Sequence, residues 1–162
     1  MAVQIYATVT GARQGAFKGE TTQKGRETMI PVVGFSYGVI TPRDTTTGKG
    51  SGKRQHQPVV LTKQWGASSP QFFTAAYTNE ILTSVVFDFF VTNAAGVQQL
   101  DHTVKLTNAA IVSVQQSLHL PQSGGPVIDS REVQEISLTF QKIDITSIPG
   151  GTEAMDDWSA SV

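Results

Sequence analysis

Cysteine is absent from this chain of 162 residues. Its absence excludes disulfides, thiolate zinc sites, iron–sulfur clusters and a cysteine nucleophile. Charge is also scarce, because charged residues make up 15% of the chain against about 25% in an average soluble domain. Such a surface is either kept soluble by Thr, Ser, Gln and Gly or covered by another subunit, and we favour the second interpretation.

Neither sign of charge is in marked excess. Lysine and arginine number 12 and aspartate and glutamate 13, giving a net charge of -1, which provides no electrostatic reason to bind nucleic acid or a membrane surface. Residues 1–5 alternate instead of forming the basic and apolar regions of a signal peptide. The apolar run at residues 84–91 is too short to span a membrane. We therefore expect folding in the cytoplasm, with no signal peptide and no membrane insertion.

Alternation of apolar and polar residues with a period of two dominates the chain. The last alternating region changes parity near Gln141 and Lys142, which predicts a bulge or a sharp bend. One short helix is expected from Ser69 as N-cap and Pro70 in the first turn. A mainly β sandwich or closed barrel follows from the number of strands. The predicted strands are at residues 3–9, 29–40, 58–65, 83–92, 100–118 and 133–148.

Two segments lack this alternation. Residues 42–57 are rich in Thr, Gly, Lys and Arg and are too long for a hairpin turn; loops of this size are usually functional or disordered. Residues 150–162 carry several acidic side chains and Trp158, and we expect a mobile C-terminal tail or a clip onto a neighbour. Nothing else marks a boundary, so residues 1–162 are predicted to form one domain.

The glycine-rich part of residues 42–57 invites comparison with a phosphate-binding P-loop. That motif has four residues between its glycine and Gly-Lys, followed by Ser or Thr. Here three residues separate Gly48 from Gly52 and Lys53, and Arg54 follows. The segment also lies between strands, so no helix N-terminus would face a phosphate. A flexible basic loop that docks on an acidic surface is the better interpretation.

No catalytic or metal-binding pattern is present. His56, His102 and His119 are scattered, without the spacing of a zinc site. His102 falls on an apolar strand face, where a hydrogen-bonded core or interface residue is the usual outcome. No G-x-S-x-G elbow accompanies the serines. We expect no enzyme activity, no cofactor and no metal.

Several segments, in this order, resemble the haemolysin-coregulated protein family, the tube subunit of type VI secretion systems. They cover most of residues 1–148, although Trp65 and Gly66 stand where many members have Ile-Asp, which leaves the subtype open. The matching segments are FKGE at 17–20, VGFSYGV at 33–39, PVVLTK at 58–63, ASSPQFF at 67–73, LTNAAI at 106–111 and the strand that ends in LTFQKI at 138–143.

The resemblance implies a two-sheet β-barrel with one short flanking α-helix and a long extended loop. It further implies a homo-hexameric ring, and rings that stack into a tube. A contractile sheath would expel this tube from the cell, with a spike protein and small effectors as partners. The subunit would assemble in the cytoplasm and be secreted without a signal peptide.

Two surfaces are predicted to mediate assembly. The loop is expected to stack rings through Arg43, Thr46, Gly48, Lys49, Gly50, Lys53 and Arg54. Contacts within a ring are expected at Phe90, Lys142 and Ile143, where the change of parity would let one strand serve its own barrel and then a neighbour's edge. The alternatives are a subunit of a phage-tail or extracellular contractile-injection tube, and a monomeric barrel that binds a small ligand.

Overall fold

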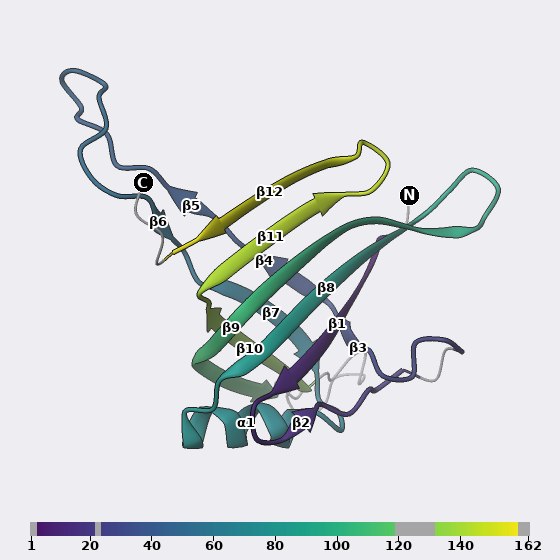
Figure 1. The fold of residues 1–162 in the computed structure, drawn as a ribbon. Coiled ribbons are helices and arrows are strands. Elements are labelled where there is room, and N and C mark those ends of the chain that lie inside the picture. Colours follow the sequence, from purple (N-terminus) through teal and green to yellow (C-terminus); the bar gives the residue numbers. More distant parts are fainter. Residues whose placement is uncertain (1–2, 22–23, 119–131, 159–162) are drawn as a thin grey trace, which may run out of the picture.

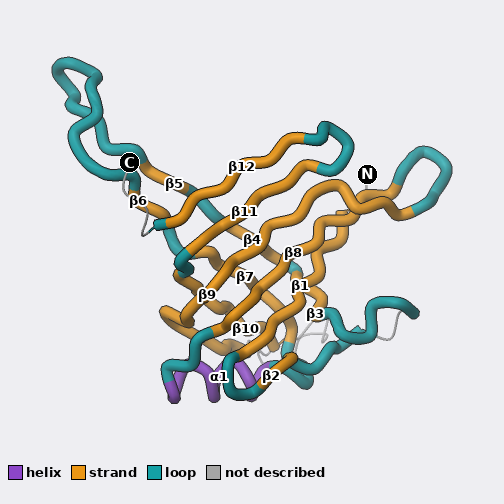
Figure 2. Tube along the Cα trace, viewed as in Figure 1, coloured by secondary structure: helices purple, strands orange, loops and turns teal. Residues whose placement is uncertain are grey.

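A computed structural model describes residues 3–21, 24–118 and 132–158 of the chain. Strands dominate it, and one short helix, α1 (Ser69–Thr78), lies at one end, as the sequence predicts (Figures 1 and 2). The strands are β1 (Val3–Gly11), β2 (Gly15–Ala16), β3 (Ile30–Val32), β4 (Gly34–Ser36), β5 (Val39–Ile40), β6 (Gln55–His56), β7 (Val59–Gln64), β8 (Leu82–Thr92), β9 (Gln98–Leu118), β10 (Glu132–Thr139), β11 (Lys142–Ser147) and β12 (Thr152–Asp157).

The long strand β9 belongs to two layers. Its first part pairs with β8 on one side and with β11 on the other, and this layer continues through β1 to β3 and through β11 to β12. Its second part pairs with β10, which is followed by β7 and β4. Apolar side chains from both layers meet in one core. Figure 1 shows the two layers diverging from β9.

Two irregularities turn β9 from one layer into the other. Asn108 has a left-handed backbone with φ 51°, a conformation that asparagine tolerates better than most residues. Leu106 and Ala109 are both buried on either side of it, so the buried face changes parity there. A second shift of register leaves Val112 exposed. The unbroken alternation expected over residues 100–118 is therefore interrupted. The inward-facing positions are even-numbered to Leu106, odd-numbered at Ala109 and Ile111, and even-numbered again at Val114.

The chain crosses between layers again after β10. β10 pairs with β9 and β7, whereas β11 pairs with the first part of β9 and with β12. The bend predicted near Gln141 and Lys142 is confirmed, since β10 ends at Thr139 and β11 begins at Lys142. The further idea that this strand serves a neighbour's edge is wrong, because both edges of β11 are occupied by strands of its own chain.

The predicted strand at 29–40 is divided into β3, β4 and β5. β3 pairs with β1 of one layer and β4 with β7 of the other, and the N–H of Val33 between them donates to the carbonyl of Thr62 at 2.8 Å. In the described ranges no pairing closes either layer on itself. The structure thus shows a two-layered, mainly β fold and does not confirm a closed barrel.

Helix α1 closes one end of the core. Phe72 and Ala75 point inward, and Phe72 packs edge-on against Phe17 with ring centroids 5.0 Å apart. The N-cap is Ser68, one residue earlier than expected, and its hydroxyl donates to Glu20 and not to the helix. This helix is too short to cross a lipid bilayer, and no other stretch of the described residues forms a helix that could.

The C-terminal segment differs from the expected mobile tail. Thr152–Asp157 forms β12 and pairs antiparallel with β11, from Lys142 opposite Asp157 to Ser147 opposite Thr152. Trp158 follows and contacts the rings of His56 and Phe140. Residues 152–158 therefore extend the first layer and cover part of its inner side.

Candidate functional site

Residues 39–57 form an arm that projects from the fold, at the upper left of Figure 1. Its base is a two-stranded sheet in which β5 pairs with β6, Val39 opposite His56. Farther out, Arg43 and Gly50 form an isolated antiparallel bridge. The arm is thus an extended hairpin with its own backbone pairing, and it was predicted from sequence as an aperiodic loop.

The tip of the arm is a turn organised by Asp44. Its carboxylate accepts the backbone N–H groups of Thr46, at 2.7 Å, and Thr47, at 3.2 Å. These two hydrogen bonds hold the pKa of Asp44 below its usual value. Gly48 adopts a left-handed conformation with φ 72° and donates its N–H to the carbonyl of Asp44. The turn is thus held by hydrogen bonds of its own, although its side chains are exposed.

The base of the arm is fastened to β12. The Asp156 carboxylate accepts hydrogen bonds from the Arg54 guanidinium and from His56 Nε2, the latter at 2.6 Å. Arg54 also donates to the carbonyl of Asp157 at 3.1 Å. On its other side, His56 Nδ1 lies 2.8 Å from the Tyr37 hydroxyl. The arm base and the C-terminal strand therefore share one polar joint, which we call the Asp156 joint.

The Asp156 joint changes the acidity of two of its members. The hydrogen bond from Arg54 lowers the pKa of Asp156 below 3.8, with a smaller contribution from His56. Burial raises the pKa of Tyr37, and the nearby Asp156 charge adds to that shift. Asp156 is therefore ionised at neutral pH, where its charge attracts the Arg54 cation.

The structure divides the predicted stacking residues into two groups. Arg54 belongs to the Asp156 joint at the base of the arm and is partly buried. The other six lie along the outer arm and are exposed: Arg43, Thr46, Gly48, Lys49, Gly50 and Lys53. The outer arm thus presents three cations and a row of small residues to the surroundings.

The three residues predicted at the ring interface lie in different environments. Phe90 is partly exposed on the outer face of β8, 5.7 Å from the Tyr6 ring, and Arg26 lies over it at 3.9 Å. Lys142 is partly exposed at the start of β11, with its amine 4.0 Å from Asp144. Ile143 is 3% exposed and belongs to the core, so its side chain is not available for contact with another copy.

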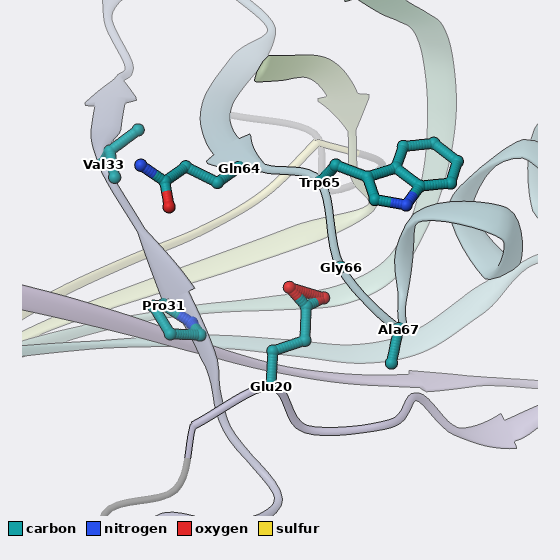
Figure 3. A pocket seen from close by; sticks show the side chains of 7 residues that line it. All are labelled: Glu20, Pro31, Val33, Gln64, Trp65, Gly66 and Ala67. Carbon is teal, nitrogen blue, oxygen red and sulfur yellow. The ribbon is translucent and has the colours of Figure 1, made fainter. Parts of the chain in front are cut away.

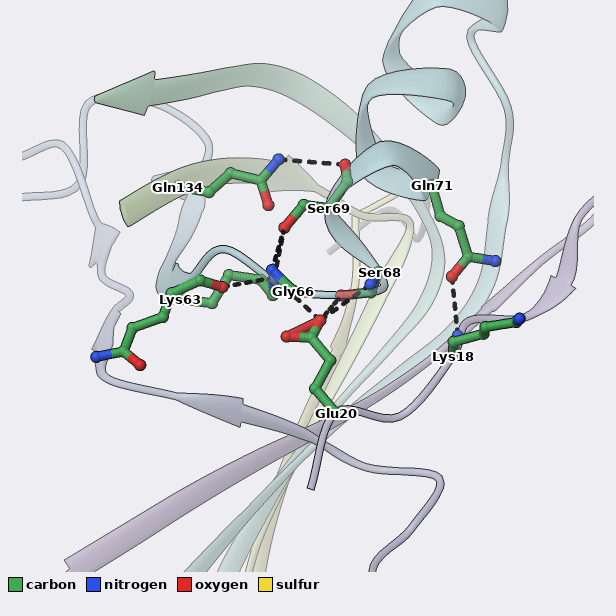
Figure 4. A network of polar contacts seen from close by, with 9 residues as sticks. Lys18, Glu20, Lys63, Gly66, Ser68, Ser69, Gln71 and Gln134 are labelled. Carbon is green, nitrogen blue, oxygen red and sulfur yellow. Dashed lines mark hydrogen bonds and ion pairs between the residues drawn. The ribbon is translucent and has the colours of Figure 1, made fainter. Parts of the chain in front are cut away.

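A buried ion pair holds the start of α1 in place (Figure 4). Lys63 on β7 is fully buried, and its amine lies 3.1 Å from the Glu20 carboxylate and 2.8 Å from Ser69 Oγ. Glu20 also accepts the Ser68 N–H at 3.0 Å. Burial lowers the pKa of Lys63, against the opposing effect of Glu20. The sequence signal for this pair was a lysine that continues the alternating inward face of Val59 and Leu61.

A pocket of about 320 Å³ lies beside this ion pair (Figure 3). Figure 3 shows the Glu20 carboxylate pointing toward Gly66 and the Trp65 ring turned away from it. A methyl group at Gly66 would overlap this carboxylate, which explains the glycine. The Glu20 charge is already matched by Lys63, so this pocket is best explained as a structural feature of the β7–α1 connection.

The histidines do not assemble a chemical centre in the described residues. His56 belongs to the Asp156 joint, and His102 stacks on Phe89 with ring centroids 4.1 Å apart while it lies 2.7 Å from Asp101. His119 lies outside the described residues. No group of three or more potential metal ligands occurs in residues 3–21, 24–118 and 132–158.

Such a fold defines a class: β-rich proteins whose prominent feature is a projecting, anchored arm. The family model described as "Type VI secretion system effector, Hcp" matches residues 6–146. The chain belongs to this family, the haemolysin-coregulated proteins of type VI secretion, as the sequence motifs indicated.

Individual relatives support this assignment, and each aligns with this chain over nearly its full length. The chain is 36% identical to the "Major exported protein" of Pseudomonas aeruginosa over 171 aligned positions, covering 100% of this chain and 99% of that protein. A crystal structure of an Hcp protein superposes with a TM-score of 0.89 at 26% identity, covering 99% and 100% of the two chains. The secreted protein Hcp3 of Pseudomonas aeruginosa gives 0.80 at 30% identity, covering 98% and 100%.

Proposed function

We propose that this chain is the structural subunit of a type VI secretion inner tube. Copies assemble into hexameric rings, the rings stack, and contraction of a sheath expels the tube together with a spike protein. Small effectors travel in the lumen. In this role the chain binds and does not catalyse, and it uses no cofactor.

The arm is the observation that carries this proposal. A hairpin whose outer residues are exposed while its base is fixed by the Asp156 joint is suited to reach another molecule. A rigid base lowers the entropy lost when a contact forms, since less of the segment must be ordered on binding. The arm therefore acts as a preorganised contact between stacked rings.

The chemistry of the outer arm indicates what it contacts. Arg43, Lys49 and Lys53 supply positive charge, and Gly48 and Gly50 allow close approach of a partner's backbone. Such a tip suits an acidic or carbonyl-rich surface on the next ring. Since exposed charges are screened within about 3 Å at 1 M salt, stacking should weaken as salt is raised.

The relatives support export of the assembled subunit. The curated relative is named a major exported protein, and one structural neighbour is called a secreted protein. We propose the same fate here, with assembly in the cytoplasm and release without a signal peptide.

Size-exclusion chromatography with light scattering, followed by electron microscopy, tests the proposed function. We expect a hexamer at micromolar concentration and few monomers, with stacks of rings at low salt that separate into rings at high salt. A monomer across a wide concentration range would contradict the proposal and would favour a ligand-binding role.

A further inference from the structure

The strand β12 and the following Trp158, which together we call the strap (residues 152–158), are weakly held along most of their length. All six residues of β12 are exposed or half-buried. Within the described part of the chain, the backbone of β12 pairs with β11 alone. A segment with few buried apolar contacts opens at a lower free energy than the core does. The strap therefore depends on contacts beyond this pairing to stay closed.

These further contacts lie at the end of the strap and come from β6 at the base of the arm (Figure 1). The Asp156 carboxylate accepts hydrogen bonds from Arg54 and His56. The carbonyl of Asp157 accepts a further one from Arg54 at 3.1 Å. The Trp158 ring lies edge-on to His56, with ring centroids 5.1 Å apart. Two residues of the arm thus contact three successive residues of the strap.

The base of the arm depends on the same contacts. Its sheet is short, since β5 and β6 are two residues long each, and His56 is the one buried residue of these four. The side chain of His56 is held there by Tyr37 on one side and by Asp156 on the other. A groove of about 340 Å³ is lined by Val39 of the arm and by Ala154 of the strap. The arm base and the strap are therefore joined chiefly through the Asp156 joint.

We propose that the strap and the arm base open and close as one unit, with Asp156 as the residue that couples them. In the closed state β12 is paired with β11 and the Asp156 joint is made; in the open state both contacts are lost. The consequence for assembly rests on the proposed function, in which the arm tip docks on another ring. Docking that fixes the arm then holds the strap closed. Because coupling between two sites is reciprocal, a closed strap strengthens docking by the same factor.

An engineered disulfide between the strap and β11 tests this coupling, because the chain contains no cysteine of its own. Lys142 and Asp157 lie directly opposite each other in the β11–β12 pairing, and both are half-buried. Directly opposite strand residues are close enough for a disulfide, so Lys142→Cys combined with Asp157→Cys should hold the strap closed when oxidised. Comparing the oxidised with the reduced form of this one protein cancels the effect of the substitutions themselves.

Hydrogen exchange at the arm base is the readout, followed by mass spectrometry of peptides covering residues 53–58 at high salt. The Gln57 N–H in this segment donates to the Gly38 carbonyl at 2.9 Å. We expect the disulfide to slow exchange there by at least about fivefold, the lower end of typical couplings between sites. With Asp156→Asn added, the disulfide should have little effect. Glu153→Gln, at an exposed position of the same strand, is the matched control and should leave the slowing intact.

Equal exchange in the oxidised and reduced forms, or the same slowing with and without Asp156, would overturn the coupling and leave the proposed function standing. The consequence for docking is measured separately by electron microscopy. Stacks of rings should persist to higher salt in the oxidised form than in the reduced form, and Asp156→Asn should remove this difference. Stacks with one salt dependence in both forms would overturn the link to docking. A chain that forms no rings would overturn the proposed function, while exchange at residues 53–58 still decides the coupling.

Discussion

At the scale of single residues, a few buried or half-buried charges determine where the exposed elements sit. Asp156 joins the arm base to β12 through Arg54 and His56. Glu20 and Lys63 join the segment after β2 to the start of α1. In both cases one carboxylate accepts hydrogen bonds from several donors in distant parts of the chain. Hydrogen bonds to charged groups contribute more than neutral ones, and a partner left unpaired carries a large penalty.

Replacing Asp156 by Asn should loosen the arm. We expect a loss of about 1–3 kcal/mol in the free energy of unfolding, measured by urea denaturation at pH 7 and fixed protein concentration. The folded-state pKa of Asp156 lies below its usual 3.8, so its contribution is complete above about pH 5 and disappears as the pH falls through the lowered value. The difference between wild type and Asp156→Asn should therefore shrink in acid. Glu153→Gln, at an exposed position of the same strand, should change stability little.

Breaking the buried ion pair should cost more than breaking the Asp156 joint. Glu20→Gln leaves the Lys63 cation buried without its counter-ion, and we expect a loss of about 3–5 kcal/mol. Burial already lowers the pKa of Lys63, so the variant should regain stability as rising pH neutralises this amine. Lys63→Met combined with Glu20→Gln should be more stable than Glu20→Gln alone. A double variant that loses the sum of both effects would show that the two groups are not coupled.

At the scale of elements, the sequence predicted those whose apolar residues follow a clean period. The strands around Val59–Gln64, Leu82–Thr92 and Glu132–Thr139 and the helix Ser69–Thr78 are all present near their expected bounds. Apolar side chains dominate the inward face of each, so burial and sequence pattern largely coincide even though Lys63 and Gln134 are also buried there.

Two features were not revealed by the sequence, the strand β12 and the bend in β9. The acidic residues of β12 predict a solvated tail. One of them, Asp156, points inward, and the burial of its carboxylate depends on Arg54 and His56, which lie about a hundred positions earlier. The Asn108 bend in β9 was also missed, since nothing near it in the sequence indicates a left-handed residue there. The same limit applied to the candidate site. Six exposed arm residues could be proposed from composition, but the attachment of Arg54 could not.

Deleting residues 46–52 should remove the stacking of rings by the arm tip and leave the attachment of the arm base intact. The tip contributes no core residue, so the ring and its melting temperature should be nearly unchanged, because the Asp156 joint and the β5–β6 pairing remain. End-to-end growth seen by electron microscopy, and secretion, should be lost. A deletion variant that falls apart into monomers would place the arm inside the ring interface instead.

At the scale of the whole molecule, β8 contributes one face to the core and the opposite face to the outer surface. Phe87 is fully buried, whereas Phe90 lies on the outer face under Arg26. Phe87→Ala should therefore lower the free energy of unfolding by about 3–5 kcal/mol. Phe90→Asp should leave the fold intact by circular dichroism and dissociate the ring in light scattering. Rings that persist in Phe90→Asp would exclude this position from the contact between copies.

Because β9 belongs to both layers, its pairing also constrains how the chain folds. Neither layer is complete until β9 is in place, because β8, β10 and β11 are all hydrogen-bonded to it. The fold also needs pairings between strands far apart in sequence, such as β1 with β8, and such non-local contacts slow folding to milliseconds or longer. Amides in the two parts of β9 should consequently exchange with solvent at similar rates, through one common opening of the whole fold.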